Sequence, residues 1–252
     1  GLKHPFEANG ENNARLSSYE DNTRNTAMSY TANVGTFDGT LRPLDWMVLT
    51  KFYDLNATYN AGDDIYEFSG SGGKFIIDGA GLDTISASDA TRDVMIDLRP
   101  GAHSHLGAKS SFITAANQLT ISHGSDIENV VTGTGDDTVI GTDLDNIIST
   151  GSGGDTIFAG GGADTIKSGI GADRIDLSES VQSQDTVALD ISSVDVGIDT
   201  IYGFAQGAFG DIFDISEILG SVFELFPLIV SGSVPTATFG GGILRVTGSD
   251  VS

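Results

Sequence analysis

The sequence predicts an all-β fold, a parallel β-roll or β-solenoid with a β-sandwich-like cap at its C-terminal end. Five nine-residue units follow one another without a gap from Thr132 to Asp176. Each unit places glycine, one polar or acidic residue and one large aliphatic residue at fixed positions, and the tail beyond them reads as strands and turns. The template G-G-x-G-x-D-x-U-x, with U a large aliphatic residue, is typical of a calcium-binding nonapeptide β-helix. A glycine-rich linker would not keep this register over 45 positions.

The five units keep an oxygen-bearing side chain and an aliphatic side chain in phase. They read TGTGDDTVI, GTDLDNIIS, TGSGGDTIF, AGGGADTIK and SGIGADRID. Position six holds Asp137, Asn146, Asp155, Asp164 and Asp173, and position eight holds Val139, Ile148, Ile157, Ile166 and Ile175.

The residue types of one unit predict its geometry. A glycine-rich turn of about six residues leads into a strand of about three, and the aliphatic side chain of the strand points inward. Successive strands lie on opposite sides of a flat coil, so two units make one turn and units n and n+2 stack. Their position-six side chains then face one another. Stacked carboxylates repel, whereas a hard cation such as Ca²⁺ accepts six to eight oxygen ligands and resolves the conflict.

Composition narrows the class of protein. The chain has 252 residues, with 35 acidic and 12 basic side chains and a formal charge of −23. This charge argues against a nucleic-acid partner, because phosphate binding needs a basic face. Cysteine is absent, so neither disulfides nor thiol chemistry are expected. The sequence has no apolar run long enough for a membrane span, and its first residues lack a Sec-type signal pattern.

The N-terminal part differs from the rest. Residues 1–30 are polar and rich in asparagine, which predicts a loop. The segment RPLDWMVLTKFYDL (42–55) predicts a helix that is well buried, with Pro43 in its first turn.

β-like, glycine-punctuated sequence starts at Asn56. NAGDDIYEF predicts a turn and a strand, and residues 69–77 and 78–86 are imperfect nonapeptides with Lys74 and Asp83 at position six. Residues 93–131 contain the strand candidates DVMIDL and QLTISH, with a loop that carries His103 and His105. The strands expected beyond Asp176 would cap the open end of the solenoid.

Several segments outside the repeats resemble a known family. GLKHP at 1–5, MSY at 28–30, PLDWMVLTKFY, GDDIYEF, DGAGLDTIS and ISHGSDIEN occur in the order seen in serralysin-type secreted zinc metalloproteases. The resemblance covers residues 1 to about 215. It implies that residues 1–56 are the loop-and-helix end of a metzincin protease domain. It also implies that residues 57–252 are a calcium-binding β-roll with a C-terminal secretion and capping region.

The resemblance also implies part of a zinc site. The family motif is H-E-x-x-H-x-x-G-x-x-H followed by a Met-turn, and GLKH fits its last four positions. His4 would then be the third zinc ligand, Met28 the Met-turn methionine and Tyr30 the tyrosine that approaches the metal. No H-E-x-x-H occurs in the sequence, so two histidines and the catalytic glutamate would precede residue 1. One histidine makes no catalytic zinc site, and we expect these residues alone to be inactive as a protease.

The calcium ligands implied by the resemblance come from pairs of units. One unit gives carbonyl oxygens from positions two and four and its position-six side chain, and the unit two ahead gives carbonyl oxygens from positions one and three and its own position six. The first site would use Gly133, Gly135 and Asp137 with Thr150, Ser152 and Asp155. The second would use Thr142, Leu144 and Asn146 with Ala159, Gly161 and Asp164. The third would use Gly151, Gly153 and Asp155 with Ser168, Ile170 and Asp173. The second site is expected to be weaker, because Asn146 carries no charge.

Further sites are implied at both ends of the repeats. Gly160, Gly162 and Asp164 would be closed by the downstream acids Asp199 and Asp211. Upstream, the resemblance implies Asn60, Gly62 and Asp63 with Asp78, Ala80 and Asp83, followed by Asp126 and Glu128 leading into the first full site.

Three functional hypotheses remain open. The favoured one is the calcium-binding part of a serralysin-like extracellular zinc metalloprotease, secreted by a type I pathway and folded by Ca²⁺ outside the cell. Its partners would be calcium ions, the protease part and the type I secretion machinery. A stand-alone calcium-dependent binding or adhesion module leaves GLKHP and MSY unexplained. Another hydrolase or polysaccharide-modifying enzyme with the same roll is disfavoured, because no G-x-S-x-G motif is present.

Overall fold

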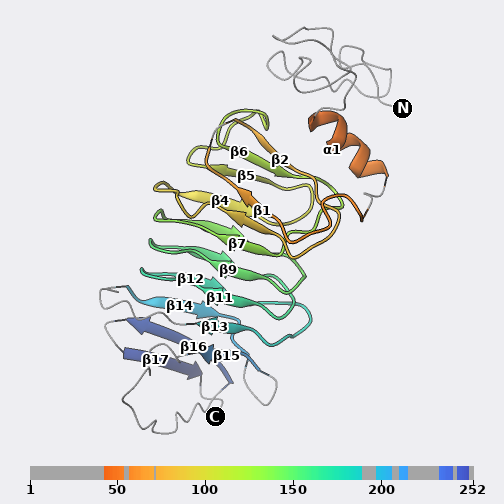
Figure 1. The fold of residues 1–252 in the computed structure, drawn as a ribbon. Coiled ribbons are helices and arrows are strands. Elements are labelled where there is room, and N and C mark those ends of the chain that lie inside the picture. The colour runs from red at the N-terminus through yellow and green to blue at the C-terminus, as the bar shows by residue number, and fades with distance from the viewer. Residues whose placement is uncertain are drawn as a thin grey trace, which may run out of the picture.

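The chain folds into a roll of two facing β-sheets (Figure 1). The computed structural model describes residues 43–53, 57–70, 72–188, 197–205 and 210–214, and the backbone of 233–240 and 243–249. The first elements are α1 (Pro43–Phe52), β1 (Ile65–Glu67), β2 (Lys74–Ile76), β3 (Thr84–Ser86), β4 (Val94–Asp97), β5 (His103–Leu106), β6 (Gln118–Ile121), β7 (Asn129–Val131) and β8 (Thr138–Ile140). The remaining elements are β9 (Ile147–Ser149), β10 (Thr156–Phe158), β11 (Thr165–Lys167), β12 (Arg174–Asp176), β13 (Thr186–Ala188), β14 (Asp199–Tyr202), β15 (Ile212–Asp214), β16 (Ser233–Gly240) and β17 (Ile243–Ser249).

Strands alternate between the two sheets along the repeats. One sheet has the order β1-β3-β7-β9-β11-β13-β15, and the other has β17-β16-β14-β12-β10-β8-β4-β5-β6-β2. Within the repeats every pair is parallel, and Thr138 lies opposite Thr156 while Ile147 lies opposite Thr165. Partners are therefore two units apart. The all-β parallel roll and the stacking of units n and n+2 are confirmed.

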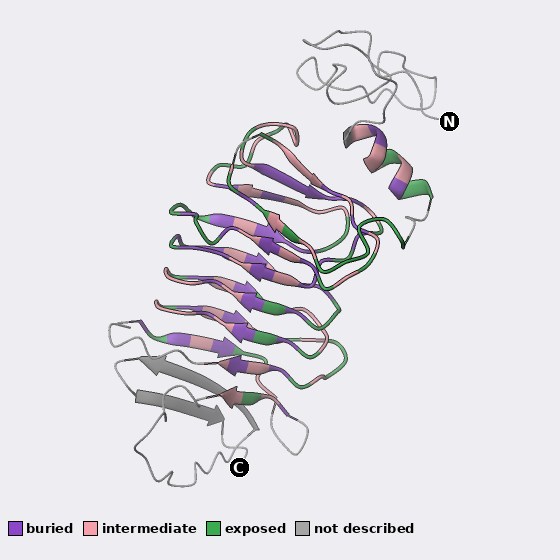
Figure 2. Cartoon of the chain, viewed as in Figure 1, coloured by how far each residue is buried: buried purple, intermediate pink, exposed green. Residues whose placement is uncertain are grey.

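The core is a double column of aliphatic side chains between the sheets. Figure 2 marks the buried residues of the strands in purple on the ribbon. The position-eight residues Val139, Ile157 and Ile175 face Ile148 and Ile166 from the opposite sheet, and all five are fully buried. Strands of three residues leave room for one inward side chain each, since side chains alternate across a strand. Burying one such side chain stabilises the fold by about 1.5–3 kcal/mol, so the roll depends on the sum over many coils.

The segment expected to be a loop with two histidines is instead strand β5. It runs antiparallel to β4 on one side and to β6 on the other. Ser104 and Leu106 are buried while His103 and His105 are half-exposed. This alternation of exposure is the period-two pattern of a strand, and the polar composition of the segment hid it at the sequence level.

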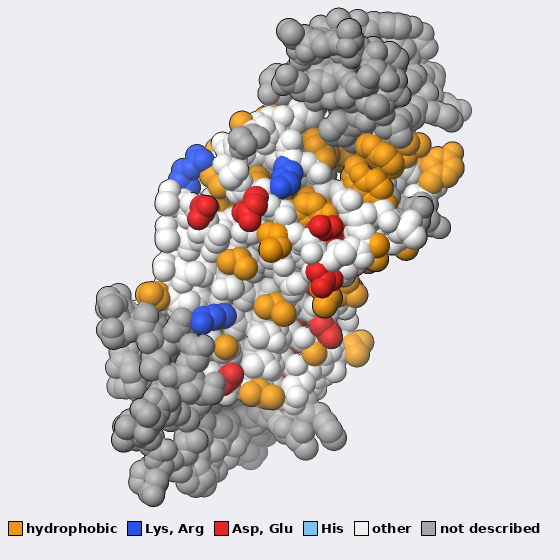
Figure 3. Space-filling view, viewed as in Figure 1, with side chains coloured by type: hydrophobic (Ala, Val, Ile, Leu, Met, Phe, Trp, Pro, Cys, Tyr) orange, Lys and Arg blue, Asp and Glu red, His pale blue; other side chains and the backbone are white. Residues whose placement is uncertain are grey.

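Helix α1 forms where it was predicted, but the expectation that it is well buried is wrong. Val48, Phe52 and Tyr53 are exposed by 43%, 72% and 66%. Its tilted ring contact joins Trp46 to Tyr59, with centroids 6.0 Å apart. Apolar side chains lie around much of the circumference of α1. When one side of the helix packs against the protein, the apolar side chains on its other sides remain in solvent. Figure 3 shows apolar side chains gathered at the end of the roll where α1 lies.

The far end of the longer sheet is covered as expected from the tail sequence. β16 pairs antiparallel with β14, and β17 pairs antiparallel with β16. The cap is thus a pair of longer strands added to the same sheet, which satisfies the edge of β14 that the roll alone would leave unpaired.

Neighbouring glycines in one turn should respond differently to substitution. Gly153 has φ of +140°, and a methyl carbon added there would lie 2.0 Å from the carbonyl oxygen of Gly135. At Gly154 the nearest atoms would be at 3.6 Å, an ordinary contact distance. We therefore expect Gly153→Ala to lower the free energy of unfolding in calcium by more than about 2 kcal/mol. Gly154→Ala should change it by less than about 0.5 kcal/mol. Chemical denaturation of both variants measures this, and equal losses would contradict the stacking described.

Candidate metal sites

The turns of the roll align polar side chains in two columns, one along each edge. The strand register makes these positions equivalent, because the residue that follows each of them pairs with the residue that follows its neighbour in the column. We define the first edge as the turns that enter the longer sheet, with Val94, Asp137, Asp155, Asp173 and Asp199. We define the second edge as the turns that enter the seven-stranded sheet, with Asp64, Asp83, Glu128, Asn146, Asp164, Asp185 and Asp211.

Apart from Asp64 in the first coil of the second edge, one carboxylate oxygen of each column acid accepts a backbone N–H from the preceding coil. On the first edge Asp137 N donates to Asp155 Oδ1 at 2.8 Å, and Asp155 N donates to Asp173 Oδ1 at 2.8 Å. On the second edge Asp164 N donates to Asp185 Oδ1 at 2.9 Å. The backbone therefore fixes each carboxylate at the junction between successive coils.

The other carboxylate oxygen is left without a hydrogen bond at four of these acids. The Oδ2 atoms of Asp83, Asp137, Asp155 and Asp164 are buried and have no hydrogen-bond partner. Each of these residues is at most 1% exposed. Buried polar atoms are nearly always paired, and a buried unpaired charge is costly. A hard cation that takes oxygen ligands would satisfy these oxygens and neutralise their charge.

Burial raises the pKa of the column acids in the metal-free protein. The pKa of Asp155 is raised to about 7, mainly by burial and also by the charges of Asp173 and Asp137. Burial likewise raises the pKa of Asp164 to about 8, with Asp185 as the main neighbouring charge. The pKa values of Asp83 and Asp185 are raised to about 6, again mainly by burial. These carboxylates hold protons unusually tightly when no cation is present.

The structure brings together the residues expected for the first site. Ser152 N donates to Gly133 O at 2.9 Å, and Thr132 Oγ1 donates to Thr150 O at 2.8 Å. The carbonyl oxygen of Gly135 faces Gly153 in the next coil. The two turns that contain Asp137 and Asp155 are thus stacked as predicted, while metal coordination by these residues stays a prediction.

The second and third sets are also stacked. In the third set Ile170 N donates to Gly151 O at 2.8 Å, Gly153 N donates to Ile170 O at 2.9 Å, and Thr150 Oγ1 donates to Ser168 O at 2.8 Å. In the second set Gly161 N donates to Thr142 O at 2.8 Å, and the carbonyl oxygen of Ala159 faces Gly141.

Thr142 and Leu144 replace template glycines without strain. Gly160 and Gly162, their equivalents one coil later, have φ of +106° and +97°, whereas Thr142 and Leu144 are not among the residues with positive φ. A side chain is therefore tolerated at both positions. Their carbonyl oxygens still face the later coil, close to Gly160 and Gly162.

The acid expected to close the fourth site is a different residue. Asp185, not Asp199 or Asp211, lies over Asp164 and accepts its backbone N–H. Asp211 lies one coil further along the second edge, where it accepts the N–H of Asp185 at 3.0 Å. Asp199 belongs to the first edge and accepts the N–H of Asp173 at 3.0 Å. The turn before Asp185 is longer than a nonapeptide turn, so period counting could not place this acid.

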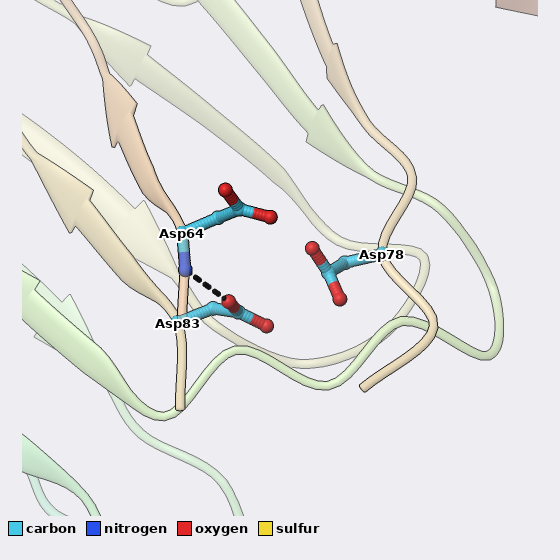
Figure 4. Close-up of side chains that lie close together, drawn as sticks. All are labelled: Asp64, Asp78 and Asp83. Carbon is cyan, nitrogen blue, oxygen red and sulfur yellow. Dashed lines mark hydrogen bonds between the residues drawn. The ribbon is translucent and has the colours of Figure 1, made fainter. Parts of the chain in front are cut away.

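Three acids converge at the upstream end of the second edge (Figure 4). Asp64, Asp78 and Asp83 each offer an oxygen within 4.8 Å of the others. Asp64 N donates to Asp83 Oδ1 at 2.8 Å, and the Tyr66 hydroxyl donates to Asp78 Oδ2. Asp78 Oδ1 accepts Ala80 N at 3.0 Å. No other group of three or more such ligand side chains occurs within the described parts of the chain.

The upstream set was predicted one residue out of register. Asp63 was expected in this set, but Asp63 Oδ1 instead accepts Leu82 N at 2.9 Å on the exposed side of the turn. Asp64 takes the position expected for Asp63. The carbonyl oxygen of Gly62 faces Gly81, and Asn60 Nδ2 donates to Ile77 O at 3.1 Å. The pairing β1–β3 would have revealed the register, since it places Asp64 opposite Asp83.

Glu128 does not lead into the Asp137 turn as expected. It lies on the second edge, where its Oε2 accepts Asp83 N at 2.9 Å, whereas Asp137 is on the first edge. Asp126 is exposed and lines an open groove of about 440 Å³ with Arg99 and Leu144.

His103 and His105 take part in ordinary hydrogen bonds. His103 Nδ1 lies 2.8 Å from Thr120 Oγ1, and His105 Nδ1 lies 2.8 Å from Gly107 O. The expected zinc-site residues His4, Met28 and Tyr30 lie outside the described residues. No helix in the described ranges is long and apolar enough to cross a membrane.

Comparison with known proteins agrees with this geometry. Residues 140–175 match the family model of the RTX calcium-binding nonapeptide repeat (4 copies). The chain is 32% identical over 173 residues to serralysin of Proteus mirabilis, covering 59% of this chain and 34% of that protein. It is 30% identical over 177 residues to metalloprotease AprA of Pseudomonas entomophila, covering 59% and 35%. It is 28% identical over 175 residues to serralysin of Photorhabdus luminescens, covering 59% and 35%. The roll is a serralysin-type RTX region, and the chain spans about a third of the length of the curated relatives it matches.

Removing one charge should weaken calcium binding more at Asp155 than at Asp137. Asp155 has acids in both adjacent coils, whereas Asp137 has Val94 on one side. Asparagine keeps the oxygen that accepts the backbone N–H. We expect Asp155→Asn to raise the calcium midpoint for folding by about tenfold, or ~1.4 kcal/mol, and Asp137→Asn to raise it less. Calcium titrations followed by circular dichroism measure both, and equal midpoints would count against a shared role for Asp155.

The metal-free roll should become more stable as the pH falls from about 8 to about 5. Asp155 and Asp164 have folded-state pKa values near 7 and 8, above the ordinary value. The folded state then binds more protons than the unfolded state, so its stability rises as pH falls through these values. Saturating calcium should reverse the trend, because protons compete with the cation. Far-UV circular dichroism in chelator across this range tests the expectation, because the folded fraction should rise as the pH falls, and an Asp155→Asn/Asp164→Asn variant should lose most of this pH dependence.

Proposed function

We propose that this chain is the calcium-dependent folding and export region of a serralysin-like extracellular zinc metalloprotease. That the roll is a calcium-binding region of a serralysin-like protein follows from its repeats and relatives. The export route, the folding role and the link to proteolysis are the proposed parts.

The observation that carries the proposal is the set of four buried carboxylate oxygens without hydrogen-bond partners, on Asp83, Asp137, Asp155 and Asp164. These residues stand in a chain whose net charge is −23. Bound calcium supplies positive charge and multiple oxygen coordination. Asp137 and Asp155 would hold it on the first edge, and Asp164 and Asp185 on the second. At the upstream end Asp64, Asp78 and Asp83 would hold it.

Folding and export are linked through the calcium concentration. Extracellular calcium modules bind in about the 10⁻⁴–10⁻³ M range, far above cytosolic levels. Without the cation the buried carboxylates repel one another, which favours an unfolded chain that can pass through a type I secretion channel. Outside the cell the binding free energy becomes folding free energy.

The protease assignment rests on the resemblance of the N-terminal segment and on the relatives. GLKH and MSY contain His4 and Tyr30 at positions that correspond to a zinc ligand and a metal-proximal tyrosine of the family. These residues would work together with a part that carries H-E-x-x-H. Peptide hydrolysis is therefore proposed for the complete protein that contains this region.

Calcium should convert the isolated chain from a largely unfolded state into the roll. We expect far-UV circular dichroism to show a gain of β-structure with a midpoint between about 10⁻⁴ and 10⁻³ M calcium. Magnesium at the same concentration should not reproduce it, because Mg²⁺ prefers a rigid octahedral shell and keeps its waters. Zinc measured on the same dialysed sample should be below one per chain. A chain whose spectrum ignores calcium would refute the folding role, and stoichiometric zinc would show that the zinc site is complete without further residues.

A further inference from the structure

The column on the second edge changes character at the junction between Glu128 and Asn146. At the junctions where the later coil brings a carboxylate, that carboxylate accepts the backbone N–H of the earlier coil. This holds for Asp83, Glu128, Asp164, Asp185 and Asp211 on the second edge and for Asp137, Asp155, Asp173 and Asp199 on the first.

At the Glu128–Asn146 junction the hydrogen bond runs in the opposite direction. The later coil donates, with Asn146 Nδ2 at 2.9 Å from the carbonyl oxygen of Glu128. The side chain of Asn146 thus offers partial positive charge to an oxygen of the earlier coil, as a bound cation would. Asn146 is 1% exposed, so bulk solvent does not reach this interaction.

The rest of the Asn146 side chain is satisfied within its own turn. Asn146 Oδ1 accepts Thr142 N at 2.8 Å, and Asn146 Nδ2 lies 3.2 Å from Thr142 Oγ1. Thr142 Oγ1 in turn accepts Leu144 N at 3.1 Å. Asp83, Asp137, Asp155 and Asp164 each keep one buried carboxylate oxygen without a hydrogen-bond partner. In contrast, both the oxygen and the nitrogen of the Asn146 side-chain amide have partners.

The three departures of this unit from the template therefore belong together. The template has glycine, glycine and aspartate where the chain has Thr142, Leu144 and Asn146. The hydroxyl of Thr142 accepts a hydrogen bond from the backbone N–H of Leu144 within the turn. The side-chain amide of Asn146 donates a hydrogen bond to the carbonyl oxygen of Glu128 in the preceding coil. Aspartate at position 146 would place a carboxylate against the carbonyl oxygen of Glu128 with no donor between them.

We infer that the side-chain amide of Asn146 takes the place of a calcium ion at the junction between the turns that end in Glu128 and Asn146. The calcium column of the second edge is interrupted there. Upstream ions would lie among Asp64, Asp78, Asp83 and Glu128, and downstream ions would lie from the Asn146–Asp164 pair onward. This inference rests on the proposed calcium binding, and it states where in the roll that binding is unnecessary.

Replacing Asn146 with aspartate introduces the carboxylate that the repeat template has at this position, and this variant tests the inference. Asn146→Asp in the full chain should bind one more calcium ion than the wild type, counted by native mass spectrometry and by calorimetric titration. Asn129→Asp adds the same charge on the adjacent strand β7, outside the turn, and should leave the ion count unchanged. In chelator Asn146→Asp should be less stable than the wild type, because the donor to Glu128 O is lost. Saturating calcium should restore it.

A second variant separates substitution by a cation from simple loss of packing. Asn146→Ala removes the donor and brings no ligand, so it should remain less stable than the wild type at every calcium concentration. An unchanged ion count in Asn146→Asp would overturn the inference. So would failure of that variant to fold in saturating calcium, or equal recovery of Asn146→Asp and Asn146→Ala. A wild-type chain that binds no calcium would instead refute the proposed function itself.

Discussion

The structure depends on one constraint, the burial of a carboxylate column at each edge of the roll. Every coil of the repeats adds an oxygen-bearing side chain at nearly the same place, and the strand register brings it over that of the preceding coil. Backbone N–H groups satisfy one carboxylate oxygen of the stacked acids, so hydrogen bonds alone hold these side chains in position without a cation. The second carboxylate oxygen is not satisfied in the same way, because four such atoms are buried and have no hydrogen-bond partner. A protein core of single aliphatic side chains must hold this column together.

Stability and function therefore oppose each other in the metal-free roll. Each coil gains a few kcal/mol from burying one or two aliphatic side chains. It also brings a buried carboxylate, whose pKa is raised to about 7 at Asp155 and about 8 at Asp164. Under the proposed function, the sum would favour folding only when protons or cations neutralise the columns. A chain built in this way is stable in one chemical environment and unstable in another, which is the property that calcium-dependent folding requires.

The roll is not uniform, and its departures from the template have separate physical causes. The longer turn before Asp185 shifts the acid that faces Asp164. The strand β5 inserts into the longer sheet between β4 and β6 and ends the strict alternation of coils. The Asn146 turn satisfies its own polar atoms and donates to the preceding coil. Each departure changes which oxygens remain available for a cation, so ligand sets cannot be copied from coil to coil.

The sequence by itself determined the parallel roll, the stacking of units two apart, and the pairing of Asp137 with Asp155 and of Asp155 with Asp173. These follow from a fixed period, because repeated identical turns force a repeated register. Only the tertiary structure decided which acids meet where the period fails. It placed Asp64 rather than Asp63 beside Asp83, Asp185 rather than Asp199 or Asp211 over Asp164, and Glu128 on the second edge. It also showed β5 as a strand and α1 as only partly buried. The physical reason is that a turn of irregular length can shift register by a residue or change edge, and only the pairing of its strand across the sheet fixes which.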